Sequence, residues 1–472
     1  MNPTSLGDPA RRQSGTRQPL LAAPLLCGAL LAGCGGGSDS GGSGDDNGGA
    51  DGTNGCTLAE QKIGLRGYML NWYLFNKQIP DPDPARFSRI EDYFYAMLVS
   101  TDQWSFVEPT AAFEQFFSAG ETLGYGISVA GRAEDPEPVR IRYIAPGSPA
   151  DVAGLTRGMI VEKINGIPAT TFKTSTAGFS VLNPGNAGQT ITLTVHDAAQ
   201  GSPTRTQALS ARVYPLVPVA RSLNMTSSTG IPVAYLHYKD FINAGQNALQ
   251  SFFKAQSALQ VKELILDLRY NGGGLISISR DIASGIAGNL KDAADLPKPF
   301  VTLRYNSERQ AANHTYQFGA PATWSTLNLQ RVYVLTGPRT CSASELVING
   351  LVPHVQVVQI GSTTCGKPYG FSPLNACGNT YNAINFDSVN ANGAGGYVNG
   401  LSPTAGCLVT DDLDHQLGDP AEALTAAALR HIDTGQCTTA GAATTVQPQR
   451  LHVVTGPTPE EGERRPGTLL PR

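Results

Sequence analysis

Residues 332–351 read VYVLTGPRTCSASELVINGL, and this stretch decides the fold because a strand pattern gives way to a helix pattern within it. The apolar run 332–335 predicts a buried strand that stops at the turn residues Gly337 and Pro338. Ser342 then stands just before an apolar segment with helical character. One interpretation is that Ser342 merely caps the helix, as serines often do. The other is chemical, because the free N–H groups at a helix start can stabilise the oxyanion formed when a serine attacks a carbonyl.

The same alternation of strands and helices continues on both sides of this stretch. Apolar runs at 233–238, 264–268 and 355–360 predict strands, and residues 248–259 have the spacing of an amphipathic helix. Alternating strands and helices are typical of a largely parallel sheet, whose functional sites lie at the carboxyl ends of the strands. We therefore predict an α/β core over residues 216–437.

Two regions of different character precede this core. Residues 57–120 have apolar side chains at helical spacing and predict a helical N-terminal domain, whereas residues 121–215 contain short alternating strands separated by turns. Within the second region, the segment IAPGSPADVAGLTRGMIVEKINGIPAT (144–170) closely resembles a PDZ domain. The chain is thus expected to be an α+β multidomain protein.

The PDZ resemblance identifies a candidate peptide-binding loop. Gly124, Tyr125, Gly126 and Ile127 stand where PDZ domains place the loop that receives the terminal carboxylate of a peptide. Consecutive backbone N–H groups freed by glycines can bind an anion, and the peptide can add as a strand to the edge of the sheet. The simpler alternative is that these residues only begin a strand.

Three loops that follow predicted strands carry residues that could do chemistry. Gly272 and Gly273 belong to an Asn-Gly-Gly-Gly loop, which could be a neutral turn or an oxyanion hole and lacks the spacing of a phosphate-binding motif. Ser342 lies in the second loop and Lys367 in the third. A serine needs a base, and a lysine can supply one if burial lowers the pKa of its amine towards neutrality. Taken singly, such residues are more often a cap and a surface charge.

Three segments resemble the C-terminal processing, or tail-specific, serine peptidases. They are LILDLRYNGGG (264–274), TGPRTCSASE (336–345) and GKPYGF (366–371), in this order after the PDZ-like region. The resemblance covers about residues 57–432. It implies that the α/β core has the ClpP/crotonase-like fold of those peptidases.

The resemblance also implies roles for individual residues. Ser342 would be the nucleophile and Lys367 its general base. Ala343, which follows the nucleophile, would supply one oxyanion N–H group, and a glycine of the Asn-Gly-Gly-Gly loop would supply the other. Gly273 is favoured for this role, although the sequence does not separate it from Gly272.

The chain departs from this family at Phe371, four residues after Lys367, where many members have a glutamine that orients the lysine. Ser344, Ser372 or a backbone carbonyl would then have to hold the amine. A related branch of the family uses a histidine, which would be expected near residues 102–105, but none occurs there.

The first 56 residues predict export. Arginines precede a short apolar stretch, 20–31, and the sequence Leu-Ala-Gly-Cys, which together have the pattern of a secretory signal and are too short to span a bilayer. This pattern resembles the lipobox of bacterial lipoproteins, with Cys34 as the lipidated residue, and Gly35 after it suits outer-membrane sorting. The alternative is an ordinary signal peptide with a chance cysteine. The Gly/Ser/Asp-rich residues 35–56 would then form a flexible linker.

The remaining six cysteines are an even number, which is typical of disulfides in an exported chain. Free thiols are the alternative, and spacing alone does not choose among the pairings. No CxxC or HxxxH spacing indicates a zinc site, so neither a metal nor another cofactor is expected. We predict the pairs Cys56–Cys437, Cys341–Cys365 and Cys377–Cys407.

The 472 residues carry a formal net charge of -4, which gives no sign of a basic surface for nucleic acid. We expect a periplasm-facing serine endopeptidase, held to the membrane by its lipid alone, that cleaves proteins or peptides with free C-termini. The alternatives are a catalytically inactive PDZ-containing lipoprotein that binds peptides, and a structural lipoprotein of the cell envelope. The predicted parts are a signal peptide (1–34), a linker (35–56), a helical domain (57–120), a PDZ domain (121–215), a peptidase core (216–437) and a disordered tail (438–472).

Overall fold

The computed structural model describes residues 56–131, 137–175 and 178–438, together with the backbone of 468–470. The predicted signal peptide, the lipidation residue Cys34 and nearly all of the predicted linker lie outside the described residues. In the part of the chain that is described, no helix combines the length and the apolar character needed to cross a membrane.

The central sheet follows from the alternating pattern of the core region. Its strand order is β10-β11-β12-β16-β17, and every neighbouring pair except β10–β11 is parallel. The prediction of a largely parallel sheet is therefore confirmed. The strands are β10 (Val219–Thr226), β11 (Pro232–Tyr238), β12 (Glu263–Asp267), β16 (Arg331–Thr336) and β17 (Gln356–Gly361).

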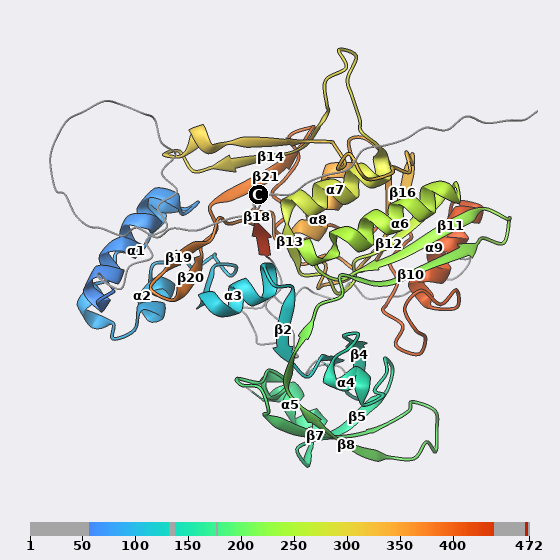
Figure 1. Cartoon of the computed structure of the whole chain (residues 1–472), viewed down its shortest axis with the longest axis horizontal. Helices are drawn as coiled ribbons and strands as arrows, with labels where there is room; N and C mark the ends of the chain where they lie inside the picture. Colours follow the sequence, from blue (N-terminus) through green and yellow to red (C-terminus); the bar gives the residue numbers. More distant parts are fainter. Residues whose placement is uncertain (1–55, 132–136, 176–177, 439–467, 471–472) are drawn as a thin grey trace, which may run out of the picture. The chain divides into compact units, whose positions relative to one another are not determined.

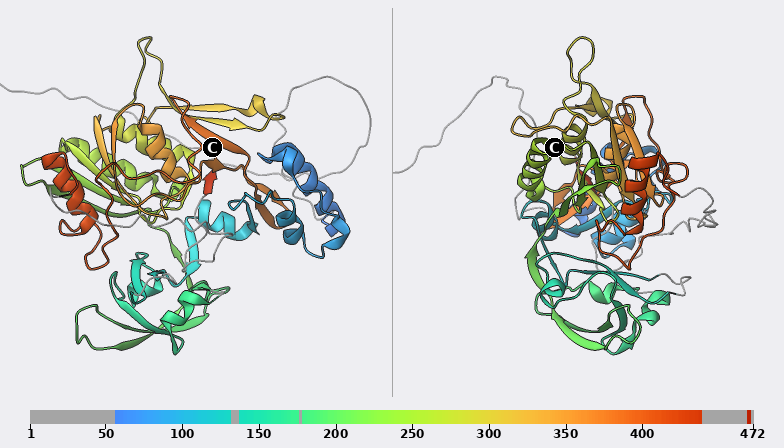
Figure 2. Two further views of the ribbon diagram at one scale, coloured as in Figure 1. Left: turned by 180° about the vertical axis from the view of Figure 1, so that it is seen from behind. Right: turned by 90° about the vertical axis from the view of Figure 1, so that its right-hand side faces the viewer.

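Helices cover both faces of this sheet (Figure 1; Figure 2, right). Successive side chains of a strand point to opposite faces, so an apolar strand needs a partner on each face. Leu264 and Leu266 of β12 share a core with three helices on one face, whereas Ile265 packs with Leu424 of a fourth helix on the other. Burial on both faces explains why these strands read as continuous apolar runs. The four helices are α6 (Gln246–Ala258), α7 (Ile276–Ala287) and α8 (Ala343–Leu351) on the first face and α9 (Ala423–Thr434) on the second.

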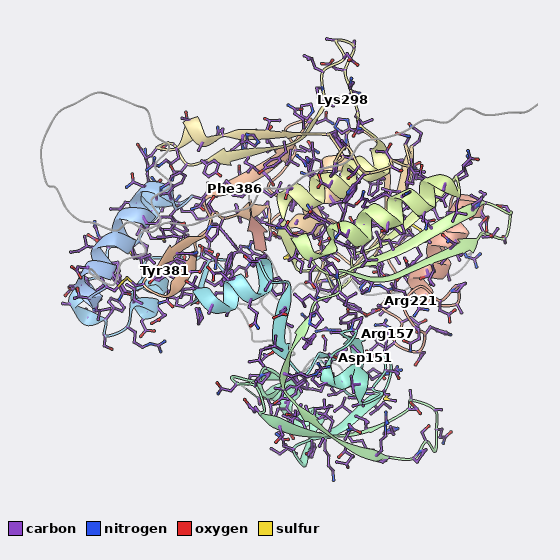
Figure 3. The ribbon with its side chains drawn as sticks, viewed as in Figure 1. Asp151, Arg157, Arg221, Lys298, Tyr381 and Phe386 are labelled. Carbon is purple, nitrogen blue, oxygen red and sulfur yellow. A yellow bond between two sulfur atoms is a disulfide. The ribbon has the colours of Figure 1, made fainter. Side chains whose placement is uncertain are left out.

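The N-terminal helices pack against a segment that comes more than 250 residues later in the chain. Tyr381, which is labelled in Figure 3, shares a small core with Leu65, Met69 and Phe94. A short strand after these helices also pairs antiparallel with the strand that carries Tyr381. The elements are α1 (Leu58–Trp72), η1 (Asn76–Gln78), η2 (Pro84–Arg86), α2 (Ile90–Ala96), β1 (Phe106–Pro109), α3 (Thr110–Phe117), β19 (Leu374–Ala376) and β20 (Asn379–Asn382).

A second sheet with its own hydrophobic core occupies most of residues 121–215. Its order is β3-β4-β5-β7-β8, with β6 paired to β5, and a two-stranded ribbon of β2 and β9 connects it to the rest of the chain. β3 is an edge strand. The elements are β2 (Glu121–Gly124), β3 (Ile127–Ala130), β4 (Arg140–Ile144), α4 (Pro149–Val152), β5 (Ile160–Ile164), β6 (Ile167–Pro168), α5 (Ala169–Thr174), η3 (Ser180–Leu182), β7 (Thr190–His196), β8 (Arg205–Ser210) and β9 (Arg212–Pro215).

The remaining strands form a four-stranded sheet and one short parallel pair. The sheet has the order β15-β14-β21-β18, and the pair consists of β13 with β22, which lies within the predicted tail. The rest of that tail after residue 438 lies outside the described residues. The elements are β13 (Gly273–Leu275), β14 (Pro299–Tyr305), β15 (His314–Gln317), β18 (Tyr369–Gly370), β21 (Phe386–Asn390), β22 (Thr468–Leu470), η4 (Asn243–Gly245) and η5 (Gln310–Ala312).

The structure contains three disulfides among the described cysteines, and it confirms one predicted pair and corrects two. Cys341–Cys365 is present, but the predicted pairs Cys56–Cys437 and Cys377–Cys407 are wrong. The observed pairs are Cys56–Cys377 and Cys407–Cys437. Contacts between distant segments explain the observed pairs. Cys56 precedes α1, which packs on the segment around Cys377. Cys437 follows α9 and lies with Cys407 in the core that α9 forms with the central sheet.

Candidate active site

Ser342 lies in the turn between the carboxyl end of β16 and the first residue of α8. Its backbone has φ 58° and ψ -115°, a conformation that costs a non-glycine residue on the order of 1–3 kcal/mol. Strained strand-to-helix turns expose the nucleophilic serine of α/β-hydrolases. The side chain is 1% exposed, and Oγ has no hydrogen-bond partner in the described structure. The Ser342 hydroxyl therefore makes no capping hydrogen bond to α8 in the described structure.

The backbone carbonyl of Asn271 holds this turn against the glycine loop. It accepts hydrogen bonds from the Cys341 N–H at 3.0 Å and from the Ser344 hydroxyl at 3.1 Å. One residue earlier than Cys341, the Thr340 hydroxyl donates to the Leu268 carbonyl at 2.8 Å. The strained turn is thus over-determined by the loop that follows β12, as backbone strain requires.

Glu345 links the serine turn to the lysine loop, and the sequence analysis did not single it out. Its carboxylate accepts from the backbone N–H groups of Ser342 (2.9 Å), Gly366 (2.8 Å) and Lys367 (2.9 Å), and from the Thr364 hydroxyl (2.5 Å). Burial raises the pKa of the Glu345 carboxyl, while these hydrogen bonds lower it. The available signal was a glutamate three residues after Ser342, the position from which an acidic side chain can return to the N–H group of a helix cap.

Lys367 is buried, with only 1% of its surface exposed. Burial lowers the pKa of its amine from 10.5 to about 7, against Asp102 and Glu345, which favour the charged form. The amine lies 4.8 Å from the ring centroid of Phe371 and 5.6 Å from that of Trp104. Burial of this kind favours the neutral amine, which can accept a proton.

No polar side chain orients this amine in the described structure, since Lys367 Nζ has no hydrogen-bond partner. Ser344, expected as one possible partner, donates to Asn271 instead, and the other, Ser372, also makes no bond to Nζ. Ser342 Oγ is equally unpartnered, so the hydrogen bond expected between Oγ and Nζ is not formed in this structure. Catalytic hydrogen bonds are often long or misaligned without substrate.

Asp102 and Trp104 occupy the segment in which a related branch of the resembled family would place a histidine. The Asp102 carboxylate accepts hydrogen bonds from its own loop, including the Ser105 hydroxyl at 2.6 Å, and from the Tyr73 hydroxyl at 2.7 Å. Its effect on Lys367 is therefore a charge effect, without a hydrogen bond. Sequence reasoning did not identify either residue as part of the lysine's surroundings.

The glycine loop approaches the serine turn so closely that a side chain does not fit. A Cβ atom built on Gly273 (φ 107°) would lie 2.8 Å from Ser342 Cβ and 3.0 Å from the backbone nitrogen of Ala343. The Gly273 N–H donates to Asn271 Oδ1 at 2.8 Å, whereas the Gly272 N–H makes no hydrogen bond in the described structure. Gly272, Gly273 and Ala343 thus lie together beside Ser342, and the Gly272 N–H is the uncommitted donor of the two glycines.

A cleft of about 590 Å³ connects the glycine loop with the second sheet. Gly124, Gly126 and Ile127 of the candidate peptide-binding loop line it, and so do Gly272 and Gly273. The remaining residue of that loop is Tyr125. Its side chain is fully buried in the core of the second sheet, so only its backbone could contribute to peptide binding. Neither Ser342 nor Lys367 lines this cleft, whose walls also include residues of β1, α3, β2 and β9.

A buried charge network ties the second sheet to the strand end that leads into the glycine loop. Arg157, from the turn before β5, donates to the Tyr270 hydroxyl at 2.5 Å and to Asp411 at 2.8 Å. Arg269, the neighbour of Tyr270, pairs with Asp267 at 2.6 Å. The network therefore couples the position of the second sheet to the loop that contains Gly272.

Two cysteine groups have the composition of a metal site but lack free thiols. Cys407 and Cys437 lie near His431, and Cys341 and Cys365 lie near Glu345. Each cysteine pair is joined in a disulfide, and only a thiolate is a strong metal ligand.

Family models match two parts of the chain. Residues 232–381 match the model of peptidase family S41, and residues 60–106 match that of the peptidase S41 N-terminal domain. Both matches fall on regions described above: the first covers the glycine loop, the serine turn and the lysine loop, and the second covers α1 and α2.

Named relatives agree with these matches over about half of their length. A carboxyl-terminal-processing protease from Synechocystis sp. is 28% identical over 258 residues, which cover 54% of this chain and 55% of that protein. A chloroplastic C-terminal processing peptidase from Tetradesmus obliquus is 26% identical, over 53% of this chain and 52% of its own. The chain thus spans about half the length of the curated relatives it matches.

Among solved structures, a putative S41 protease from Bacteroides fragilis is similar over 79% of this chain and 97% of its own, with 27% identity and a TM-score of 0.63. The photosystem II D1 C-terminal processing protease is similar over the same share of this chain, with 19% identity and a TM-score of 0.50, and this likeness concerns the fold alone.

Proposed function

The chain belongs to peptidase family S41, and from this premise we propose that it is a serine endopeptidase in which Ser342 is the nucleophile and Lys367 the general base. The observation that carries the proposal is the burial of Lys367. It lowers the pKa of the amine to about 7 and leaves Nζ without a competing partner, while Glu345 holds the backbones of both residues.

Neutral Lys367 accepts the proton of the Ser342 hydroxyl as Oγ forms a bond to the substrate carbonyl carbon. The resulting ammonium then donates its proton to the nitrogen of the leaving peptide when the C–N bond breaks. This leaves an ester between Ser342 and the substrate acyl group, and a neutral lysine. Water next gives a proton to Lys367 and attacks the ester, and the serine recovers its proton as the acid product leaves.

The oxyanion of each tetrahedral intermediate accepts hydrogen bonds from backbone N–H groups beside the nucleophile. The Ala343 N–H, at the start of α8, is one donor. The second is the Gly272 N–H, which carries no bond before substrate arrives, or the Gly273 N–H, if the Asn271 carboxamide releases it. The favoured assignment of Gly273 thus needs a side-chain movement that Gly272 does not.

The substrate is an extended protein C-terminus captured by a PDZ domain over residues 121–215. Support comes from β3, whose free edge can pair with a peptide strand, and from Gly124 and Gly126, which leave the carboxylate-binding loop open to the cleft. The same cleft runs to Gly272, so a peptide held at β3 has a continuous path to the glycine loop. The printed names of the relatives also refer to carboxyl-terminal processing.

The protein acts in the bacterial envelope, attached through a lipid on Cys34. Three disulfides among the described cysteines suit an oxidising compartment. Metabolic labelling with a radioactive fatty acid tests the anchor: label should enter the wild type and not Cys34→Ala, and the variant should leave the membrane fraction. Equal labelling of both would contradict the assignment of Cys34.

Cleavage of an unstructured polypeptide such as casein, and of a peptide with a free apolar C-terminus, tests the peptidase. Ser342→Ala and Lys367→Ala should each lose several orders of magnitude in kcat, on the order of 10³-fold or more. The matched controls, Ser251→Ala and Lys254→Ala, change exposed residues of α6 and should cleave as the wild type does. Peptide binding without cleavage by the wild type would instead favour the catalytically inactive peptide-binding protein.

A further inference from the structure

A covalent link joins the two loops that carry the proposed dyad. Cys341 directly precedes Ser342, and Cys365 stands two residues before Lys367. The two cysteines form a disulfide with their Cα atoms 5.2 Å apart, and the Cys341 side chain is fully buried. The disulfide therefore lies beside both residues of the proposed dyad.

The lysine depends on its backbone for its position. Nζ has no hydrogen-bond partner in the described structure, and the ring centroids of Phe371 and Trp104 lie 4.8 Å and 5.6 Å from it. Phe371 stands where the resembled peptidases have an orienting glutamine. An amine without such a partner is placed by packing and by the main chain alone. The relative position of the two loops therefore sets the distance from Nζ to Ser342 Oγ.

Several hydrogen bonds also join the serine loop to the lysine loop, but they are weaker restraints than the disulfide. The Cys365 N–H donates to the Thr340 carbonyl at 3.0 Å, and the Glu345 carboxylate bridges the N–H groups of Ser342 and Lys367. Ser342 also has a positive φ, and a non-glycine residue keeps this strained conformation only when the surrounding structure restrains it. A bond that ends one residue from Ser342 supplies that restraint.

We propose that the Cys341–Cys365 disulfide is a positioning element of the dyad, which keeps Ser342 and Lys367 at reacting distance. The inference rests on the proposed peptidase function. It predicts that the oxidised enzyme is about 10- to 100-fold faster than the reduced one. A dithiol reductant would break the S–S bond, give two cysteine thiols and itself become a cyclic disulfide, so that electrons and protons balance.

The test compares two double variants of the full chain. Cys341→Ala/Cys365→Ala removes the proposed positioning bond, and Cys407→Ala/Cys437→Ala removes a disulfide elsewhere as the matched control. The first should lose about 10- to 100-fold in kcat with an unchanged KM, since small displacements of reacting groups cost this much. Its pH midpoint for kcat should also move, because the surroundings of the lysine change. The control should keep kcat and its pH midpoint, even at a lower Tm.

Unchanged kcat and pH midpoint in the folded Cys341→Ala/Cys365→Ala variant would overturn the proposal. If that variant does not fold, the Cys407→Ala/Cys437→Ala protein is reduced with dithiothreitol while kcat and near-ultraviolet circular dichroism are followed. The kcat should fall by about 10- to 100-fold while the fold persists and should return on reoxidation, whereas full activity of the reduced, folded protein would overturn the proposal.

These outcomes are separate from a failure of the peptidase assignment. If the wild type and Ser342→Ala are equally inactive, the proposed function is wrong, and the positioning role of the disulfide is wrong as well. If the wild type cleaves, Ser342→Ala does not, and the variant without the disulfide is as fast as the wild type, only the positioning role fails.

Discussion

Replacing Lys367 with methionine should stabilise the folded protein near neutral pH, although it removes the proposed base. Burial lowers the pKa of the Lys367 amine from 10.5 to about 7. At about 1.4 kcal/mol for each pKa unit, keeping an ammonium at this site costs up to about 5 kcal/mol relative to the unfolded chain. Methionine has a similar length, fills the space beside Phe371 and Trp104, and carries no charge to bury.

The sign of the pH dependence follows from the protons bound in each state. Between pH 7 and pH 10.5 the unfolded chain keeps a proton that the folded chain has released, so the free energy of unfolding of the wild type rises with pH in this window. The advantage of Lys367→Met is therefore largest below about pH 7 and fades as the pH approaches 10.5.

The assay is urea unfolding at several pH values between neutral and alkaline. Both proteins should carry Ser342→Ala, so that self-cleavage does not intervene, and Lys254→Met at an exposed site serves as the matched control. The control should show no advantage at any pH. A Lys367→Met variant that is less stable than its parent at neutral pH, or whose advantage is constant with pH, would refute the reasoning about the buried amine.

Three further changes test neighbouring parts of the site. Glu345→Gln leaves some of its hydrogen-bond donors without an acceptor, so we expect a loss of about 1–3 kcal/mol in urea unfolding and a lower kcat in peptide cleavage; a variant with wild-type kcat would show that the carboxylate does not align the dyad. Deleting residues 439–472 removes β22 from the edge of β13 beside the glycine loop, and kcat/KM for a C-terminal peptide should rise; an unchanged value would mean that β22 does not compete with substrate. Arg157→Ala leaves the Tyr270 hydroxyl without this donor and removes one of the two arginines that pair with Asp411, the other being Arg269, so we expect about 1–3 kcal/mol lower stability and a raised KM, whereas an unchanged KM would show that the second sheet does not deliver substrate through this contact.

Local patterns in the sequence predicted much of the fold. The apolar runs predicted the strands of the parallel sheet because both faces are buried, and the change from strand to helix pattern located the turn at Ser342. The Cys341–Cys365 pair was also predictable, since it joins the loops after two adjacent strands, β16 and β17.

The parts that sequence reasoning missed depend on contacts between distant segments. Cys56 meets Cys377 because α1 packs on the segment around β19 and β20, and no local pattern contains that contact. Glu345 and Asp102 act through burial and charge at a lysine that lies far from Asp102 in the sequence. The burial of the Tyr125 side chain in the core of the second sheet depends on the packing of that sheet, while a role for its backbone in peptide binding stays a prediction.

The pH dependence of acylation tests most directly whether Lys367 is the base that activates Ser342. A peptide ester mixed in excess with the enzyme, followed by mass spectrometry at early times, gives the rate at which the acyl group appears on the peptide that contains Ser342. We expect this rate to rise with pH through a single midpoint near 7 in the wild type, and to be slower by on the order of 10³-fold in Lys367→Ala. Acylation at the wild-type rate in Lys367→Ala, or an acyl group on another residue, would contradict the account.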